Sequence, residues 1–224
     1  MVKKVQYNIN RYMKLKRYLT EGKFEDNIET LKKDCMPYLK ESKLWHKRTI
    51  MGVGRGESIA KGNLLKMKPR KNRIPTDTPA PLHFALDKWF KKKFGWNVRS
   101  EGVFTSPFPT LFQHTPIFFP IGPFKYVYSN EVQDLYMDLK EIAVDNYGIS
   151  DFSEAFVKFC DVNGNVDMLM EVFIKQYGDG FVKTHLNDVN PAYEVVFKCK
   201  EYYMMVSNEI VKRKIKKPAD ILKL

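Results

Sequence analysis

The chain has 224 residues, of which 44% are hydrophobic and 14% aromatic, so it can bury a sizeable core. No stretch approaches the ~20 apolar residues that a membrane span needs. The polar start Met1-Val2-Lys3-Lys4 lacks the apolar segment of a secretory signal. Three widely spaced cysteines and four scattered histidines predict free thiols in a reducing compartment and no metal site.

The net charge of +12 is unevenly distributed along the chain. Residues 1–100 carry 25 Lys and Arg against 9 Asp and Glu, residues 101–207 carry 7 against 15, and the tail from residue 208 carries 6 against 2. A basic front and tail around an acidic middle favour a polyanionic partner, DNA or RNA, bound through its phosphates with little sequence preference. A solvated lysine-rich surface explains the same distribution equally well.

The first part of the chain is predicted to be helical and basic. Apolar spacing predicts helices over Asn8–Leu19 and Phe24–Met36, and Pro37 ends the second one. We therefore expect a basic helical region at residues 1–45, followed by the main domain at residues 46–224. The β-prone stretch Thr49–Val53 begins that domain.

A basic loop and a lysine-rich helix come next. Lys66–Arg73 is expected to be the loop, and the prolines of residues 74–81 exclude a helix there. Leu82–Phe94 has the pattern of an amphipathic helix that ends at Gly95. The candidate nucleic-acid contacts are the lysines on its outer face and the basic tail: Lys88, Lys91, Lys92, Lys212, Arg213 and Lys214.

Alternating apolar residues predict a strand over Asn97–Ser106, and Pro107 and Pro109 end its pairing. The next stretch, residues 107–124, is dense in Phe and Pro. Aromatic residues at this density are usually core residues, but a ring such as Phe112 would also suit stacking on a nicotinamide or a base.

The C-terminal half alternates strands and helices without a regular βαβ order, which predicts an α+β fold. Glu194 lies near the start of the apolar strand expected at Tyr193–Cys199. The expected elements are a strand at Tyr126–Tyr128, a helix capped by Ser129 and running to about Asn146, helices at Asp151–Phe159 and Val166–Tyr177, a strand at Tyr193–Cys199, and Tyr202–Val206, which extends or pairs with that strand.

Three motifs follow one another in an order that resembles the ADP-ribosyltransferase fold in its phage-encoded variants. They are Arg55-Gly56, the segment Arg99–Ser106, and Glu194-Val195-Val196. The resemblance covers about residues 49–206, and the shared order of the motifs carries it. It implies a split β-sandwich whose cleft holds NAD as co-substrate, after an N-terminal helical region.

The resemblance also implies roles for these residues. Arg55, beside Gly56, would hold an NAD phosphate through its planar guanidinium. Glu194 is the implied catalytic acid, because a carboxylate near the ribose offsets the positive charge of an oxocarbenium-like transition state. The other implied cofactor-binding residues are Arg99, Thr105, Ser106 and Phe112.

The chain departs from the family pattern at two positions. Ala192 stands where the family commonly has an acid or a glutamine, which leaves the acceptor open between a protein and a nucleic acid. Phe104 replaces the first serine of the usual Ser-Thr-Ser. The expected setting is the cytoplasm of a phage host. The alternative is a non-catalytic, nucleic-acid-binding or virion-associated protein that keeps the fold.

Overall fold

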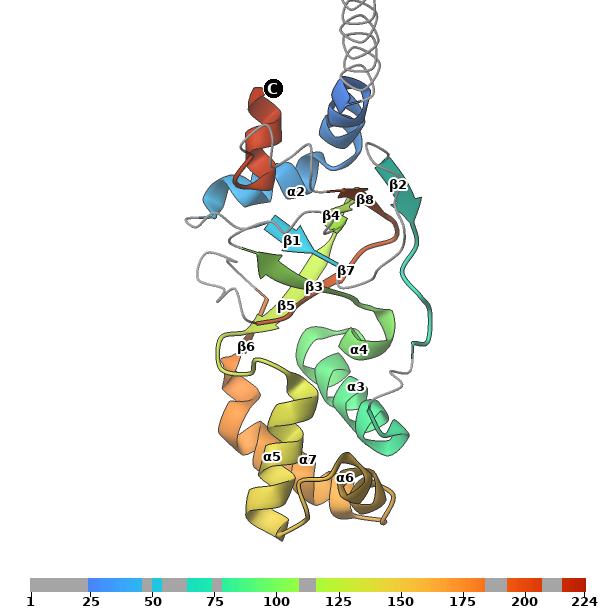
Figure 1. The fold of residues 1–224 in the computed structure, drawn as a ribbon, viewed down its shortest axis with the longest axis vertical. Coiled ribbons are helices and arrows are strands. Elements are labelled where there is room, and N and C mark those ends of the chain that lie inside the picture. Colours follow the sequence, from blue (N-terminus) through green and yellow to red (C-terminus); the bar gives the residue numbers. More distant parts are fainter. Residues whose placement is uncertain are drawn as a thin grey trace, which may run out of the picture.

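The computed structural model describes residues 24–45, 50–53, 64–73, 78–108, 116–183, 193–206 and 215–224. An eight-stranded sheet lies between two groups of helices (Figure 1), which confirms the expected α+β class. The described N-terminal helices and the C-terminal helix η4 (Pro218–Lys223) cover one end of the molecule, and α3 to α7 cover the other. Among the described helices, none is long and apolar enough to cross a membrane.

All strand pairings in the sheet are antiparallel, and the order is β2-β8-β4-β1-β3-β7-β5-β6. The strands are β1 (Ile50–Gly52), β2 (Leu64–Met67), β3 (Val103–Phe108), β4 (Pro116–Pro120), β5 (Lys125–Ser129), β6 (Phe181–Val182), β7 (Val195–Lys198) and β8 (Tyr202–Val206).

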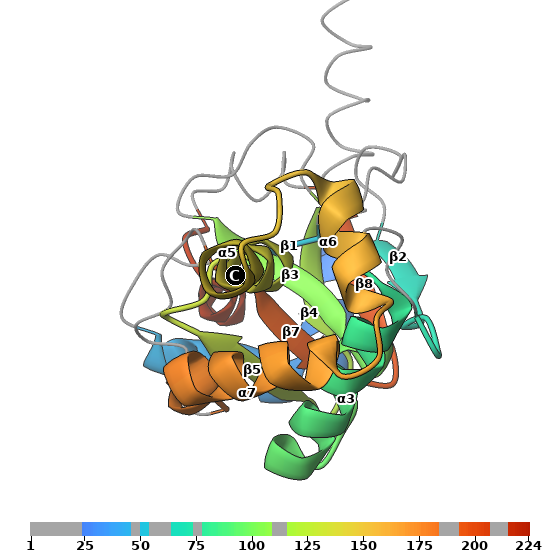
Figure 2. The same cartoon turned by 90° about the horizontal axis from the view of Figure 1, so that it is seen from below.

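The helices between residues 80 and 177 pack together on one side of the sheet (Figure 2). They are α3 (Ala80–Phe94), α4 (Val98–Glu101), α5 (Leu135–Tyr147), α6 (Ser153–Cys160) and α7 (Asn165–Tyr177), followed by the 3-10 turn η2 (Gly178–Gly180). At the opposite end lie residues 24–34, which are helical, α2 (Met36–Glu41) and η1 (Ser42–Leu44).

Strand alternation divides the core into two apolar clusters. Successive side chains of a strand point to opposite faces. On β5, Tyr126 and Tyr128 join the first cluster, with the N-terminal helices and η4, whereas Val127 joins the second cluster, with α3 to α7. On β7, Val195 and Val196 divide in the same way. The strands β5 and β7 therefore belong to both clusters.

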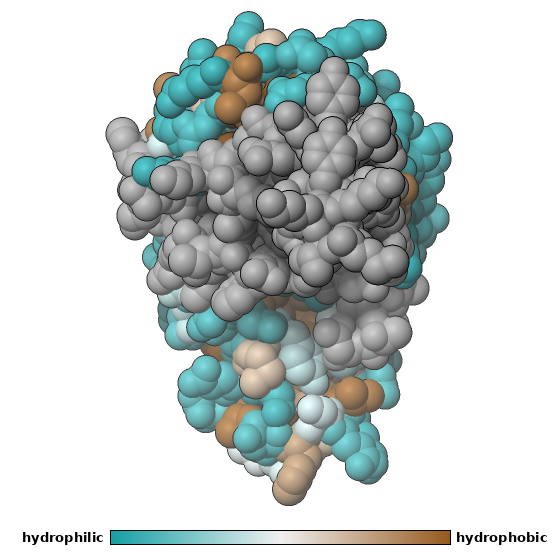
Figure 3. Space-filling model, turned by 45° about the horizontal axis from the view of Figure 1, so that its top comes forward, coloured by the Kyte–Doolittle hydropathy of each residue, from teal (hydrophilic) through white to brown (hydrophobic). Residues whose placement is uncertain are grey.

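The hydrophobic residues outside these clusters are spread over several elements. Four exposed examples are Leu44 in η1, Phe84 in α3, Met137 in α5 and Phe152, which directly precedes α6. In Figure 3 the hydrophobic groups on the coloured surface are small and separated by hydrophilic residues. This view therefore shows no single broad apolar face.

The helix expected at Leu82–Phe94 is confirmed as α3, and Gly95 ends it with φ 81. It begins at Ala80, with Pro81 in its first turn, so the prediction that the prolines of residues 74–81 exclude a helix was wrong at its end. The N-terminal prediction was partly wrong. Helical residues 24–34 end before Cys35, and Pro37 lies in the first turn of α2 instead of ending a helix. Proline is tolerated there because first-turn N–H groups have no partner within the helix. The helix expected at Asn8–Leu19 lies outside the described residues.

Two other boundaries differ because a side chain caps a helix. The strand expected from Asn97 starts only at Val103, since α4 forms first and Asp87 accepts hydrogen bonds from its N-terminal amides. The helix α5 begins after Asp134, whose carboxylate caps it, whereas the Ser129 hydroxyl accepts from two amides in the preceding turn.

Three predictions about pairing were also wrong. Pro107 continues the β3–β1 ladder, which it can do because β7 pairs with β3 only as far as Thr105 and leaves an open edge beyond it. Lys66 and Met67 belong to β2 and not to a loop. Finally, β8 lies between β2 and β4 and does not pair with β7. Residues 202–205 of β8 are all buried, which suits a strand inside the sheet.

Candidate functional site

A pocket of about 320 Å³ lies over the sheet where β2, β3 and β8 approach the residue before β7. We call it the main pocket. Its lining combines apolar, aromatic and charged side chains with one glycine, and its volume lies in the range of small-molecule sites. The lining residues are Val53, Met67, Lys68, Pro69, Arg70, Arg73, Gly102, Val103, Phe104, Ser106, Glu194, Tyr202 and Met204.

The main pocket brings together Ser106 and Glu194, which come from two separate sequence motifs. Thr105 pairs with Val195 in the antiparallel β3–β7 ladder, so the next residue of β3 lies opposite the one before β7. Phe104 and Ser106 line the pocket from the same face of β3. Thr105 points to the other face, where its buried hydroxyl donates to the Val195 carbonyl at 2.8 Å. Thr105 therefore joins two strands and does not line the pocket.

Among the described lining residues of the main pocket three are basic, namely Lys68, Arg70 and Arg73. Among the described lining residues Glu194 is the only acid. Glu201 lies nearby, outside the lining, and its carboxylate is 2.7 Å from the Lys66 ammonium and 3.9 Å from that of Lys68. The hydrogen bond from Lys66 lowers the pKa of Glu201. The described part of the pocket therefore favours an anionic ligand.

The ring of Phe104 contacts two guanidinium groups. That of Arg73 lies 4.4 Å from the ring centroid, and that of Arg99 lies 5.7 Å from it. Both distances are within the range of cation–π interactions. Phe104, at the position where the resemblance would place a serine, therefore holds two cations beside Glu194.

Glu194 and Phe104 also line a second, smaller cavity of about 30 Å³ on the side of α3 and α5. Arg99 reaches this cavity and not the main pocket. The Arg99 side chain is buried, and its Nη2 donates to the Thr78 hydroxyl at 2.9 Å. Arg99 thus lies near Glu194, but on a helix rather than on the strand that the sequence predicted.

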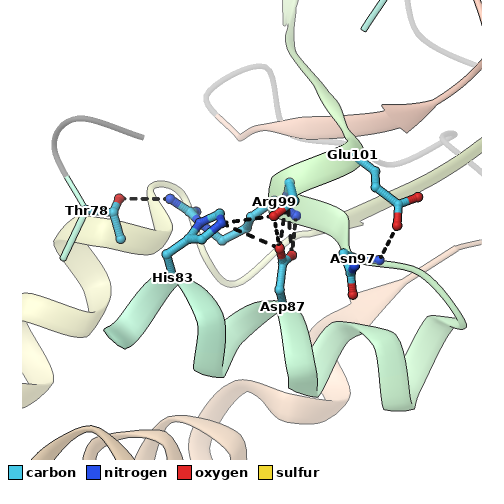
Figure 4. A network of polar contacts seen from close by, with 7 residues as sticks. Thr78, His83, Asp87, Asn97, Arg99 and Glu101 are labelled. Carbon is cyan, nitrogen blue, oxygen red and sulfur yellow. Dashed lines mark hydrogen bonds and ion pairs between the residues drawn. The ribbon is translucent and has the colours of Figure 1, made fainter. Parts of the chain in front are cut away.

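A polar network holds α4 in place beside the site (Figure 4). The Asp87 carboxylate, from α3, accepts the Arg99 N–H at 2.8 Å and the Ser100 N–H at 3.1 Å. The Ser100 hydroxyl also donates to Asp87. These bonds satisfy two amides in the first turn of α4, whose N-cap residue Asn97 makes no side-chain cap.

His83 belongs to the same network but not to a catalytic triad. Its Nε2 lies 3.0 Å from the Ser100 hydroxyl and 3.6 Å from the Asp87 carboxylate. A triad needs the carboxylate on the other ring nitrogen, and His83 Nδ1 has no hydrogen-bond partner among the described residues. Burial lowers the pKa of His83, which favours the neutral ring. The contact of this ring with Ser100 links α3 to α4.

Several predicted site residues cannot be placed. Arg55, Gly56, Phe112 and Ala192 lie outside the described residues, as do the tail residues Lys212, Arg213 and Lys214. On α3 the expected stripe is exposed, since Lys88, Lys91 and Lys92 all face solvent.

Sequence analysis missed Lys68, Arg70 and Arg73 as pocket residues. The signal was the density of basic residues over positions 66–73, which indicated only a loop.

The described residues contain no cluster of His, Cys, Asp or Glu suited to a metal ion. Comparison of the chain with protein-family models, with curated proteins and with solved structures gives no match.

Proposed function

We propose that the main pocket binds NAD and that the protein transfers ADP-ribose to a macromolecular acceptor. The observation that supports this most is that Ser106 and Glu194 line one pocket that also carries basic residues. The resemblance assigned these two residues to one site from sequence motifs alone. A carboxylate, a hydroxyl and several cations are the groups that a ribose and a pyrophosphate require.

Each described residue has a definite task in this proposal. The Arg73 guanidinium neutralises the phosphates, and the Ser106 hydroxyl forms a hydrogen bond with the ribose. The Glu194 carboxylate offsets the positive charge that develops on the ribose as its bond to nicotinamide breaks. The acceptor atom forms the new bond to the same ribose carbon and gives up its proton, and nicotinamide leaves.

The test is incubation of the purified protein with labelled NAD and separate pools of protein, RNA and DNA. Glu194→Gln keeps the size of the side chain and removes its charge, so we expect turnover to fall about a hundredfold or more. NAD binding, measured by calorimetry, should survive in this variant. Turnover near the wild-type rate in Glu194→Gln would refute the assigned role.

A non-catalytic nucleic-acid-binding protein is the second candidate. It is favoured by the basic first hundred residues and by the three exposed lysines of α3, Lys88, Lys91 and Lys92. Affinity for DNA or RNA would then fall steeply as salt rises to ~0.2 M. Absence of NAD binding by the wild-type protein, together with salt-sensitive nucleic-acid binding, would select this candidate.

A further inference from the structure

The segment 68–73 at the main pocket is rich in basic residues. It contains Lys68, Arg70, Lys71 and Arg73, and the first three are exposed. Within the described residues, no carboxylate lies within ion-pair distance of Arg70 or Lys71. The charges of Arg70 and Lys71 are therefore available to an external anion.

This segment is anchored at both ends. Before it, Met67 pairs with Tyr202 in the β2–β8 ladder. At its end, the Arg73 N–H donates to the Ser100 carbonyl at 3.3 Å, and the Arg73 guanidinium packs on Phe104. Asn72 takes a left-handed conformation, φ 51, which forms a turn between the two anchors. The cations are thus displayed on a fixed segment beside the pocket.

Aromatic side chains complete the arrangement. Phe104, whose ring packs on the Arg73 guanidinium, and the mostly buried Tyr202 line the same pocket as Lys68 and Arg70. Proteins that bind single-stranded nucleic acids combine such a cationic track with aromatic rings on which bases stack. Single strands are favoured over duplexes, because a base can enter a pocket only when it is unstacked. An acidic peptide would use the cations but not the rings.

We propose that the segment 68–73 binds the phosphate backbone of a single-stranded nucleic acid and brings one nucleotide to the main pocket beside Glu194. The bound nucleic acid is then the acceptor of the proposed transferase. This role as acceptor rests on the proposed function. A base nitrogen or sugar hydroxyl then forms the bond to the ribose of NAD and loses its proton, and nicotinamide departs.

Binding is tested without NAD, by fluorescence anisotropy of a labelled 12-nucleotide RNA at several salt concentrations. The variant Lys68→Gln/Arg70→Gln/Lys71→Gln removes three exposed charges from the segment. We expect affinity at ~0.1 M salt to fall at least tenfold, and the slope of log affinity against log salt to shrink by about 2, since each phosphate contact contributes about 0.7. Circular dichroism verifies that this surface variant is folded.

The matched control removes the same charge elsewhere, in Lys125→Gln/Lys158→Gln/Lys175→Gln, and should change affinity less than twofold. Unchanged binding in the segment variant would overturn the proposal. So would a loss confined to a variant with Lys88, Lys91 and Lys92 changed to Gln, because it would place the contact on α3.

Placement is tested with a 4-thiouridine RNA, whose photocrosslinks are mapped by mass spectrometry. We expect them on peptides that contain Phe104 or Tyr202, and crosslinks only on other peptides would overturn delivery to the pocket. A poly-glutamate peptide that competes as well as unlabelled RNA would overturn the choice of nucleic acid. Calorimetry with NAD tests the proposed function independently. RNA binding at the pocket without NAD binding would refute the transferase activity but would still support the RNA-binding site.

Discussion

Gly102 occupies a position that only glycine fits, between α4 and β3. A Cβ atom there would lie 2.4 Å from the Val98 carbonyl oxygen and 2.1 Å from a Val196 methyl group. The backbone conformation is ordinary, with φ −86, so the constraint is space alone. Gly102 also lines the main pocket. A residue in the motif that resembles a transferase strand is therefore fixed by packing.

We expect Gly102→Ala to lower the free energy of unfolding by about 2–3 kcal/mol, because overpacking at a backbone contact forces the neighbours to move. Chemical denaturation measures the change. Gly122→Ala is a useful comparison, since a Cβ at Gly122 meets no atom within 4 Å and would cost only its left-handed backbone strain. A Gly102→Ala variant as stable as wild type would contradict the tight contact.

The buried His83 gives stability a defined pH dependence. Burial lowers its pKa from 6.5, Asp87 opposes this shift, and Arg99 and Arg73 add to it. Below a pH of about 6.5 the unfolded chain therefore binds more protons than the folded protein. The stability that is present above this pH is lost as the pH falls. We expect the free energy of unfolding to drop between pH 7 and pH 5.

The control for this pH dependence is His83→Gln, which does not titrate. Its stability should be lower at pH 7, since the contact with Ser100 is disturbed, but it should vary less between pH 7 and pH 5. Parallel curves for the two proteins would show that His83 is not the group responsible.

At the scale of elements, α4 depends on a carboxylate from another helix. Asp87, on α3, accepts hydrogen bonds from two backbone amides of α4 and from the Ser100 hydroxyl. We expect Asp87→Ala to cost roughly 2–3 kcal/mol, because hydrogen bonds to a buried charged acceptor are strong and their loss leaves amides unsatisfied. Asp145→Ala, on the exposed face of α5, should change stability by less than about 0.5 kcal/mol. Equal effects would contradict the capping role.

The sequence predicted most helices, because 3.6-residue periodicity and glycine C-caps are local signals. It failed at α4, since the acceptor that stabilises this helix comes from Asp87, twelve residues before Arg99. It predicted the strand β8 but not its pairing, because the partners β2 and β4 are distant in sequence. The approach of Ser106 to Glu194 followed from motif order, whereas the basic lining depended on where the segment 68–73 lies after the edge strand β2. Long-range pairing decides such features, and no local pattern contains it.

At the scale of the whole molecule, the two apolar clusters are joined through shared strands. Val195 belongs to the first cluster and its neighbour Val196 to the second. Separating the clusters would therefore break the β3–β7 and β5–β7 ladders as well as the packing. We infer that the described parts of both clusters open together, in a single cooperative unfolding event.

Two buried cysteines report on the two clusters separately. Cys35 lies in the first and Cys160 in the second, and burial raises the pKa of each thiol to about 12. The half-buried Cys199 has a pKa of about 12 as well. Thiolate is the reactive form, so at pH 8 the native thiols should react on the order of a thousandfold more slowly than thiols of pKa 9.

In Cys199→Ser, labelling with a thiol reagent followed by mass spectrometry separates the remaining two sites. If the clusters open together, Cys35 and Cys160 should be labelled at the same rate near the denaturation midpoint, and both should react fully in strong denaturant. Because β5 and β7 supply alternate residues to each cluster, an opening that frees Cys160 also disturbs the strands of the first cluster, in which Cys35 lies. Labelling of Cys160 tenfold faster than Cys35 would instead mean that α3 to α7 unfold as a separate unit, and that the main pocket, lined by strands and the segments next to them, persists without these helices.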